Sequence, residues 1–158
     1  MLMKISWFSL YKVVLALWVG GMSIFTFLIA PVIFKSYGKD MASDIVGHIF
    51  PRYFLYDLIL AAAALALFFL LSIERKAFAS RLSLVLLAAA LIVNVFIVFK
   101  LYPDAVQAKQ EVTSFERESP DSPARRKFTR LHALSASLNL FLLVDGIMLL
   151  MAVPATEK

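Results

Sequence analysis

The feature that most constrains this chain is a set of four stretches that contain almost no charge. Each carries at most one Lys, Arg, Asp or Glu, and they cover residues 13–34, 53–73, 82–101 and 131–153. Because an α-helix rises about 1.5 Å per residue, each stretch is long enough to cross a hydrocarbon core about 30 Å thick. The sequence therefore predicts four membrane-spanning helices.

Composition and residue order favour helices over a membrane barrel. Hydrophobic residues make up 61% of the chain and charged residues 17%, against about 25% charged residues in soluble domains. A barrel needs short strands of alternating polarity, whereas these stretches are continuously apolar. We therefore predict an all-α fold, in which residues 1–158 form a single membrane domain, an integral membrane four-helix bundle.

Small residues recur in every predicted span. In lipid, helices associate through close backbone approach, which small side chains permit. We therefore expect a compact bundle, in which these positions lie at helix contacts: Ala16, Gly20 and Gly21, Ala61 to Ala64, Ala88 to Ala90, and Ser135 to Ser137.

The connection between the first two spans has a helical pattern of its own. Within residues 39–50, apolar residues recur every fourth position, and Asp40 and Asp44 lie on the opposite side. This pattern predicts a short amphipathic helix lying at the membrane interface between spans one and two. Gly47 precedes Pro51 by four residues and leaves room for the proline ring at the start of span two.

The connection between the last two spans is polar, and we predict a loop over residues 103–122. Ser122 and Pro123 are typical of the N-cap and the first position of a helix, so the fourth helix should begin before its membrane part. Its first turns would present basic residues to the headgroups, where they can anchor the chain to anionic lipid. They are Arg125, Arg126 and Arg130.

Basic residues distribute unequally between the two sides of the predicted bundle. Ten Lys and Arg lie on the side of the 103–122 loop, and six lie on the side of the two termini. The positive-inside rule predicts that the loop side is cytoplasmic and that both termini are outside, in a bacterial cytoplasmic membrane. The same residues explain the net charge of +5 without a nucleic-acid partner.

Each predicted span contributes one polar residue at a similar depth. At about 1.5 Å per residue, these side chains lie roughly 8–12 Å below the membrane surface on the loop side. They are Thr26, Asp57, Asn94 and Asn139. Polar groups inside a bilayer are costly, so we expect them to point inward as one layer.

Both histidines of the chain belong to the same side. His132 shares a helix face with Ser135 and Asn139, and Asp44 precedes His48 by one helical turn, where it could orient the ring. One interpretation is that the polar layer only joins the helices by hydrogen bonds. The other is that His48 and His132, with Asp57, bind a transition-metal ion or the iron of haem b.

Asp145 lies apart from this layer, near the opposite membrane surface. We expect it to form an ion pair with Lys12, whose stem can reach inward from the start of span one. A proton or cation relay is the functional alternative. Tyr11, Trp18 and Tyr53 are interpreted as members of the aromatic belts at the two interfaces.

Three segments carry a resemblance to a known family. They read APVIF at 30–34, IVGHIFPRYF at 45–54 and RLHALSASLNL at 130–140. With them the chain resembles bacterial membrane proteins of unknown function related to eukaryotic transmembrane protein 205. The resemblance implies a four-helix membrane protein; the eukaryotic relatives are linked to cisplatin resistance. Small four-helix families associated with copper resistance and haem-dependent oxidation are more distantly similar in architecture.

Three classes of function stay open on sequence alone. The first is a module that binds a small ligand, a metal ion or haem, at the histidine-bearing end. The second is a small transporter or exporter, which could act as a homo-oligomer. The third is an accessory or assembly subunit. The sequence has no cysteine, nucleophile elbow, phosphate loop or HExxH motif, which favours a non-enzymatic role while leaving an enzyme open.

Overall fold

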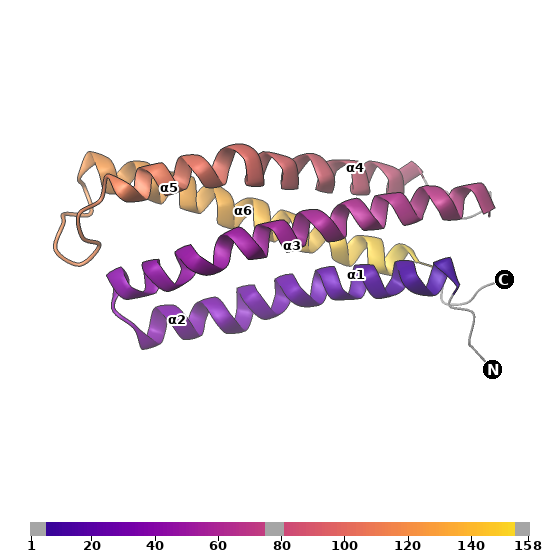
Figure 1. The fold of residues 1–158 in the computed structure, drawn as a ribbon, viewed down its shortest axis with the longest axis horizontal. Coiled ribbons are helices and arrows are strands. Elements are labelled where there is room, and N and C mark those ends of the chain that lie inside the picture. Colours follow the sequence, from indigo (N-terminus) through magenta and orange to yellow (C-terminus); the bar gives the residue numbers. More distant parts are fainter. Residues whose placement is uncertain (1–5, 75–80, 154–158) are drawn as a thin grey trace.

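A computed structural model describes residues 6–74 and 81–153, and all regular secondary structure in these residues is helical (Figure 1). The elements are α1 (Trp7–Ile24), the π-helical turn η1 (Phe25–Ile29), α2 (Ala30–Ser36), α3 (Lys39–Glu74), α4 (Arg81–Phe96), the π-helical turn η2 (Ile97–Leu101), α5 (Tyr102–Gln110) and α6 (Pro123–Ala152). They form four long apolar helices of membrane-spanning length, because α1, η1 and α2 are continuous, as are α4, η2 and α5. The predicted all-α four-helix fold is confirmed.

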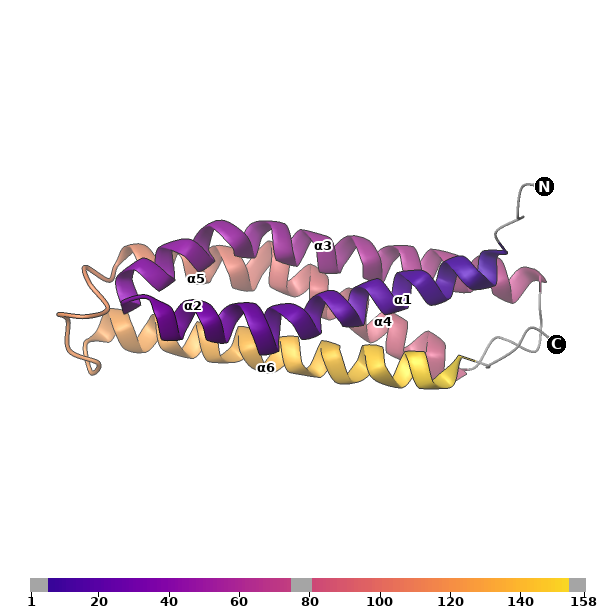
Figure 2. The same cartoon turned by 90° about the horizontal axis from the view of Figure 1, so that it is seen from below.

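The four helices form an antiparallel bundle. α1 packs against α3 and α6, α4 packs against the same two helices, and α5 continues along α6. Figures 1 and 2 show that the start of α3, the end of α5 and the start of α6 gather at one end. We call this the loop end, because residues 111–122 connect α5 to α6 there.

The interior and exterior of the bundle are both apolar. Trp18, Leu15 and Leu87 are fully buried among the helices, whereas Ile92 and Phe99 are about 70% exposed. A soluble protein rarely presents such a continuous apolar surface to water. The outward residues therefore face lipid, and the chain is an integral membrane protein.

Each π-helical turn lies just before a proline. The N–H of Ala30 bonds to the carbonyl of Phe25, and the N–H of Tyr102 bonds to that of Ile97, so each turn is one residue wider than an α-helical turn. Pro31 and Pro103 follow at once, and a proline ring crowds the preceding turn, which a wider turn accommodates. Both wide turns lie near the loop end.

The segment expected as a separate interfacial helix is continuous with span two. Residues 39–50 are helical, but they form the first turns of α3, which runs unbroken through Pro51. Contacts from α5 explain the continuity, because the Lys109 ammonium bonds to the Asp44 carboxylate at 2.8 Å and holds these turns against the bundle.

The segment expected as a loop over 103–122 is shorter in the structure. Residues 103–110 belong to α5 and only 111–122 are non-helical. Lys100 and Asp104, one turn apart, form an ion pair at 3.1 Å across the start of α5, and Ala108 is fully buried. As expected, α6 begins at Pro123, with Ser122 as N-cap accepting a bond from the Arg125 N–H at 3.2 Å.

Candidate functional site

Three helices meet through a chain of hydrogen bonds below the loop end. The Tyr53 hydroxyl on α3 donates to the Asn139 Oδ1 on α6 at 2.5 Å. The Asn139 Nδ2 donates in turn to the Thr26 hydroxyl in η1 at 2.9 Å. The structure thus joins two of the four polar residues singled out in the spans, Thr26 and Asn139, and adds a tyrosine.

The other two polar span residues are deeply buried. Asp57 and Asn94 are each 1% exposed. Asn94 donates to the carbonyl of Ala90 one turn earlier on its own helix, at 2.9 Å, and Asp57 Oδ1 has no hydrogen-bond partner among the described residues. All four side chains are inside the bundle or half-buried, and the Asp57 carboxyl group lies within hydrogen-bonding reach of the Tyr53 hydroxyl. Their arrangement in one layer stays a prediction.

Sequence reasoning missed Tyr53 and grouped it with the aromatic belts. Tyr53 is 9% exposed, and Tyr11 and Trp18 are buried more deeply still, so these three rings belong to the core rather than to a lipid-facing belt. The spacing of Tyr53 and Asp57, one helical turn apart, was the available signal, because two polar groups on one helix face point into the bundle together.

A cavity of about 320 Å³ opens at the loop end beside this network. Side chains from all four long helices and from the loop line it, and most are apolar. They are Phe34, Lys39, Ser43, Val46, Gly47, Phe50, Phe54, Leu101, Tyr102, Ala105, Val106, Lys109, Phe115, Phe128, His132 and Ser135. We call it the apolar cavity.

A second, smaller cavity of about 220 Å³ borders the polar network. Thr26, Tyr53 and Asn139 line it, and it shares five wall residues with the apolar cavity. His132 is one of the shared residues, so its ring lies between the two spaces. Together they offer an apolar chamber with one polar wall.

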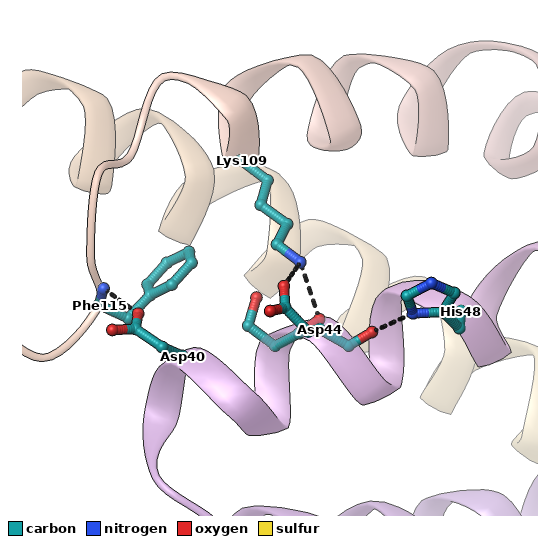
Figure 3. Close-up of polar contacts among 6 residues, drawn as sticks. Asp40, Asp44, His48, Lys109 and Phe115 are labelled. Atoms are coloured by element: carbon teal, nitrogen blue, oxygen red, sulfur yellow. Dashed lines mark hydrogen bonds and ion pairs between the residues drawn. The ribbon is translucent and has the colours of Figure 1, made fainter.

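The two histidines lie in different environments. The His132 ring is half-buried and stacks on Phe128, with ring centroids 5.8 Å apart and planes at 10°. The His48 ring is exposed and lines neither cavity. Its Nδ1 donates to the backbone carbonyl of Asp44 at 2.8 Å, while the Asp44 carboxylate pairs with Lys109 (Figure 3).

The loop contributes one residue, Phe115, to the wall of the apolar cavity. The Asp40 carboxylate accepts the Phe115 N–H at 2.5 Å (Figure 3). It also accepts the Ser114 hydroxyl at 2.6 Å, and the two bonds fasten the loop to the start of α3. The Phe115 ring then contacts Phe128 with centroids 4.9 Å apart and forms part of the cavity wall. Asp40 therefore sets the position of a lining residue.

The loop is also held by its own carboxylate. Glu118 accepts the Ser122 hydroxyl at 2.5 Å and the Thr113 N–H and hydroxyl, each at 3.0 Å. The hydrogen bond from Ser122, followed by those from Thr113, holds the pKa of Glu118 below its ordinary value. The loop is thus closed by hydrogen bonds to an ionised group.

A metal or haem site was one interpretation of the two histidines and Asp57. No group of three or more His, Cys, Asp or Glu side chains gathers in the described part of the chain. His132 borders both cavities, whereas His48 lines neither. Binding of a metal ion or of haem by His48, His132 and Asp57 has no support in this geometry.

Asp145 and Lys12 lie at the opposite end of the bundle, on the packed helices α6 and α1. Asp145 is 2% exposed, and neither carboxylate oxygen has a hydrogen-bond partner among the described residues. The Lys12 ammonium lies 4.3 Å from the centre of the Phe8 ring. The ion pair between the two residues stays a prediction.

Residues 13–114 match the family described as a domain of unknown function (DUF4149). The chain belongs to this family. The DUF4149 match spans the first three long helices and ends within the loop, so it includes Thr26, His48 and Tyr53 but not the α6 residues. Neither a curated protein nor a solved structure matches the chain.

Proposed function

We propose that this DUF4149 protein binds a small, largely apolar ligand in the apolar cavity at the histidine-bearing end. The observation that carries the proposal is the cavity itself. Ligand pockets typically measure about 300–1,000 Å³ and combine an apolar lining with a few oriented polar groups. At about 320 Å³ the apolar cavity falls within that range, and its lining includes the ionisable side chains of Lys39, Lys109, His132 and Tyr102.

The polar groups near the cavity support a ligand with one polar end. The imidazole of His132 borders both cavities, and Tyr53 and Asn139 line the smaller one. In the lipid environment, a ligand hydroxyl or carbonyl could exchange hydrogen bonds with these groups while its apolar body packs on the phenylalanines. Phe50, Phe54 and Phe128 supply that packing surface.

Co-purified molecules test this proposal. We expect the full-length protein, purified from its native membrane, to retain about one small organic molecule per chain in native mass spectrometry. Ala105→Phe should displace it, because Ala105 lines the apolar cavity and the added ring would fill the space. Ala133→Phe adds the same ring at an exposed position of α6 and should leave retention unchanged.

The two histidines offer a second comparison. His132→Ala should weaken retention of the molecule, whereas His48→Ala should not, because His48 lies outside the cavity walls. Equal retention by Ala105→Phe and the wild type would contradict the proposal. A Soret band or stoichiometric metal in the same sample, lost in both histidine variants, would instead support the haem or metal hypothesis.

Kinship and orientation form part of the same proposal. The three segments APVIF, IVGHIFPRYF and RLHALSASLNL support a relation to transmembrane protein 205. The ten basic residues of the loop side support a cytoplasmic loop end, with both termini outside a bacterial cytoplasmic membrane. The exposed apolar faces would also allow a homo-oligomer in the bilayer.

A further inference from the structure

A hollow that is separate from both cavities described above lies between α5 and α6 at the loop end. Its volume is about 610 Å³, and it shares no lining residue with the other two cavities. Three of its seven lining residues are basic, and the full set is Asp104, Gln107, Pro123, Arg126, Lys127, Arg130 and Leu131. We call it the basic hollow.

Two arginines carry the uncompensated charge of the basic hollow. The Asp104 carboxylate pairs with Lys100 at 3.1 Å, and Lys127 pairs with Glu111 at 2.6 Å. Within residues 6–74 and 81–153, neither Arg126 nor Arg130 has an ion-pair partner, and both side chains are exposed. They lie one helical turn apart, so both guanidinium groups can face the same hollow.

The length of α6 brings these arginines to the depth of the lipid headgroups. Its 30 residues measure about 45 Å, roughly 15 Å more than a hydrocarbon core needs. The charge-poor part of the helix reaches its C-terminal end, so the excess length lies at the N-terminal turns, where Arg126 and Arg130 are. Leu134, one turn deeper, is 43% exposed and borders the acyl-chain region.

We propose that the basic hollow binds the phosphate of an anionic phospholipid. The guanidinium groups of Arg126 and Arg130 would each donate paired hydrogen bonds to phosphate oxygens, a geometry that suits arginine better than lysine. Leu131 and Leu134 would contact the start of the acyl chains. Basic pockets between membrane helices are a known form of headgroup site.

Lipid titration of the purified full-length protein tests this site. Native mass spectrometry with added phosphatidylglycerol should show an affinity that falls about thirtyfold in the Arg126→Gln/Arg130→Gln double variant. This corresponds to about 2 kcal/mol, or about 1 kcal/mol for each basic residue at an anionic surface. Lys35→Gln/Arg52→Gln removes the same charge from exposed positions at the same end and should change the affinity less than threefold.

Competing ligands and matched variants decide the proposal. Phosphatidylcholine should bind more weakly than phosphatidylglycerol, and excess inorganic phosphate should not displace the lipid. Displacement by inorganic phosphate alone would assign the hollow to free phosphate and overturn the lipid assignment. An unchanged affinity in the double arginine variant, or an equal loss in the Lys35 and Arg52 control, would overturn the site.

Arg126→Lys/Arg130→Lys should retain part of the binding, because charge is kept while paired donation is lost.

Discussion

At the scale of single residues, the candidate site depends on Asn139. Its amide uses its oxygen for Tyr53 and its nitrogen for Thr26, so one side chain connects α3, α6 and η1. An amide can do this because it carries an acceptor and two donors at its end. Inside a bilayer no water molecule replaces a lost hydrogen-bond partner. Loss of this connection should therefore affect both the stability of the bundle and the geometry of the site.

Removing the tyrosine hydroxyl tests the connection. We expect Tyr53→Phe to lower the free energy of unfolding by about 0.6 kcal/mol and at most about 1.7 kcal/mol, the average and the largest values for hydrogen bonds between membrane helices. Thermal or denaturant unfolding in detergent would measure the change. Tyr37→Phe removes the hydroxyl of an exposed tyrosine and should have no effect. Equal losses in both variants would show that the bond to Asn139 contributes nothing specific.

At the scale of elements, the contact between α1 and α3 depends on a glycine. A Cβ at Gly21 would lie 2.6 Å from Cε1 and 2.8 Å from the hydroxyl of Tyr56. That ring cannot move away freely, because its hydroxyl donates to the carbonyl of Leu17 at 2.6 Å. The neighbouring Gly20 has no atom within 4 Å of its Cβ position.

The two adjacent glycines form a matched pair of variants. Gly21→Ala should destabilise the bundle by about 1–3 kcal/mol, the usual cost of overpacking, because it forces Tyr56 away from α1. Gly20→Ala should be neutral or slightly stabilising, since alanine favours helix over glycine. Unfolding in detergent would compare them. A loss at Gly20 as large as that at Gly21 would contradict the proposed steric contact.

The loop between α5 and α6 should respond to acid. Since the pKa of Glu118 is lowered in the folded state, its hydrogen bonds contribute fully above the ordinary glutamate value of about 4.3 and are lost as pH falls through the lowered pKa. The Thr113 amide, which donates to Glu118, should then exchange hydrogen faster. Hydrogen exchange against pH, corrected for the intrinsic rate, measures this.

Substitution of the same loop provides the control. Glu118→Gln should remove the acid-dependent change at Thr113, because the amide does not ionise in this range. Glu116→Gln alters a nearby carboxylate that does not contact Thr113 and should preserve the change. An identical acid response in Glu118→Gln and the wild type would assign the opening to another group, such as Asp40 at the start of α3.

At the scale of the whole molecule, orientation in the membrane is testable. Ten basic residues on the loop side against six on the other predict a cytoplasmic loop. Reporter fusions after residue 110 should therefore report the cytoplasm, and fusions at the C-terminus the exterior. The opposite pattern would reverse the assignment of sides, and would leave the four spans and both proposed sites intact.

The parts of the fold that were predictable depend on local sequence. Four spans follow from four long stretches without charge, and the start of α6 follows from Ser122 and Pro123. The continuity of α3 and the helical residues 103–110 were missed. Both depend on partners distant in sequence: Asp44 binds Lys109, and Ala108 is buried in the packed bundle.

The sequence alone determined that this chain is a helical membrane protein, because the bilayer requires every span to satisfy its own backbone hydrogen bonds. It also marked Thr26, Asn139 and His132 as notable. Only the tertiary structure decided that Asn139 joins Thr26 to Tyr53, that His132 borders a cavity and that His48 does not. Which side chains come into contact depends on how each of the four helices is rotated about its axis and packed against the others. No local sequence pattern encodes that rotation.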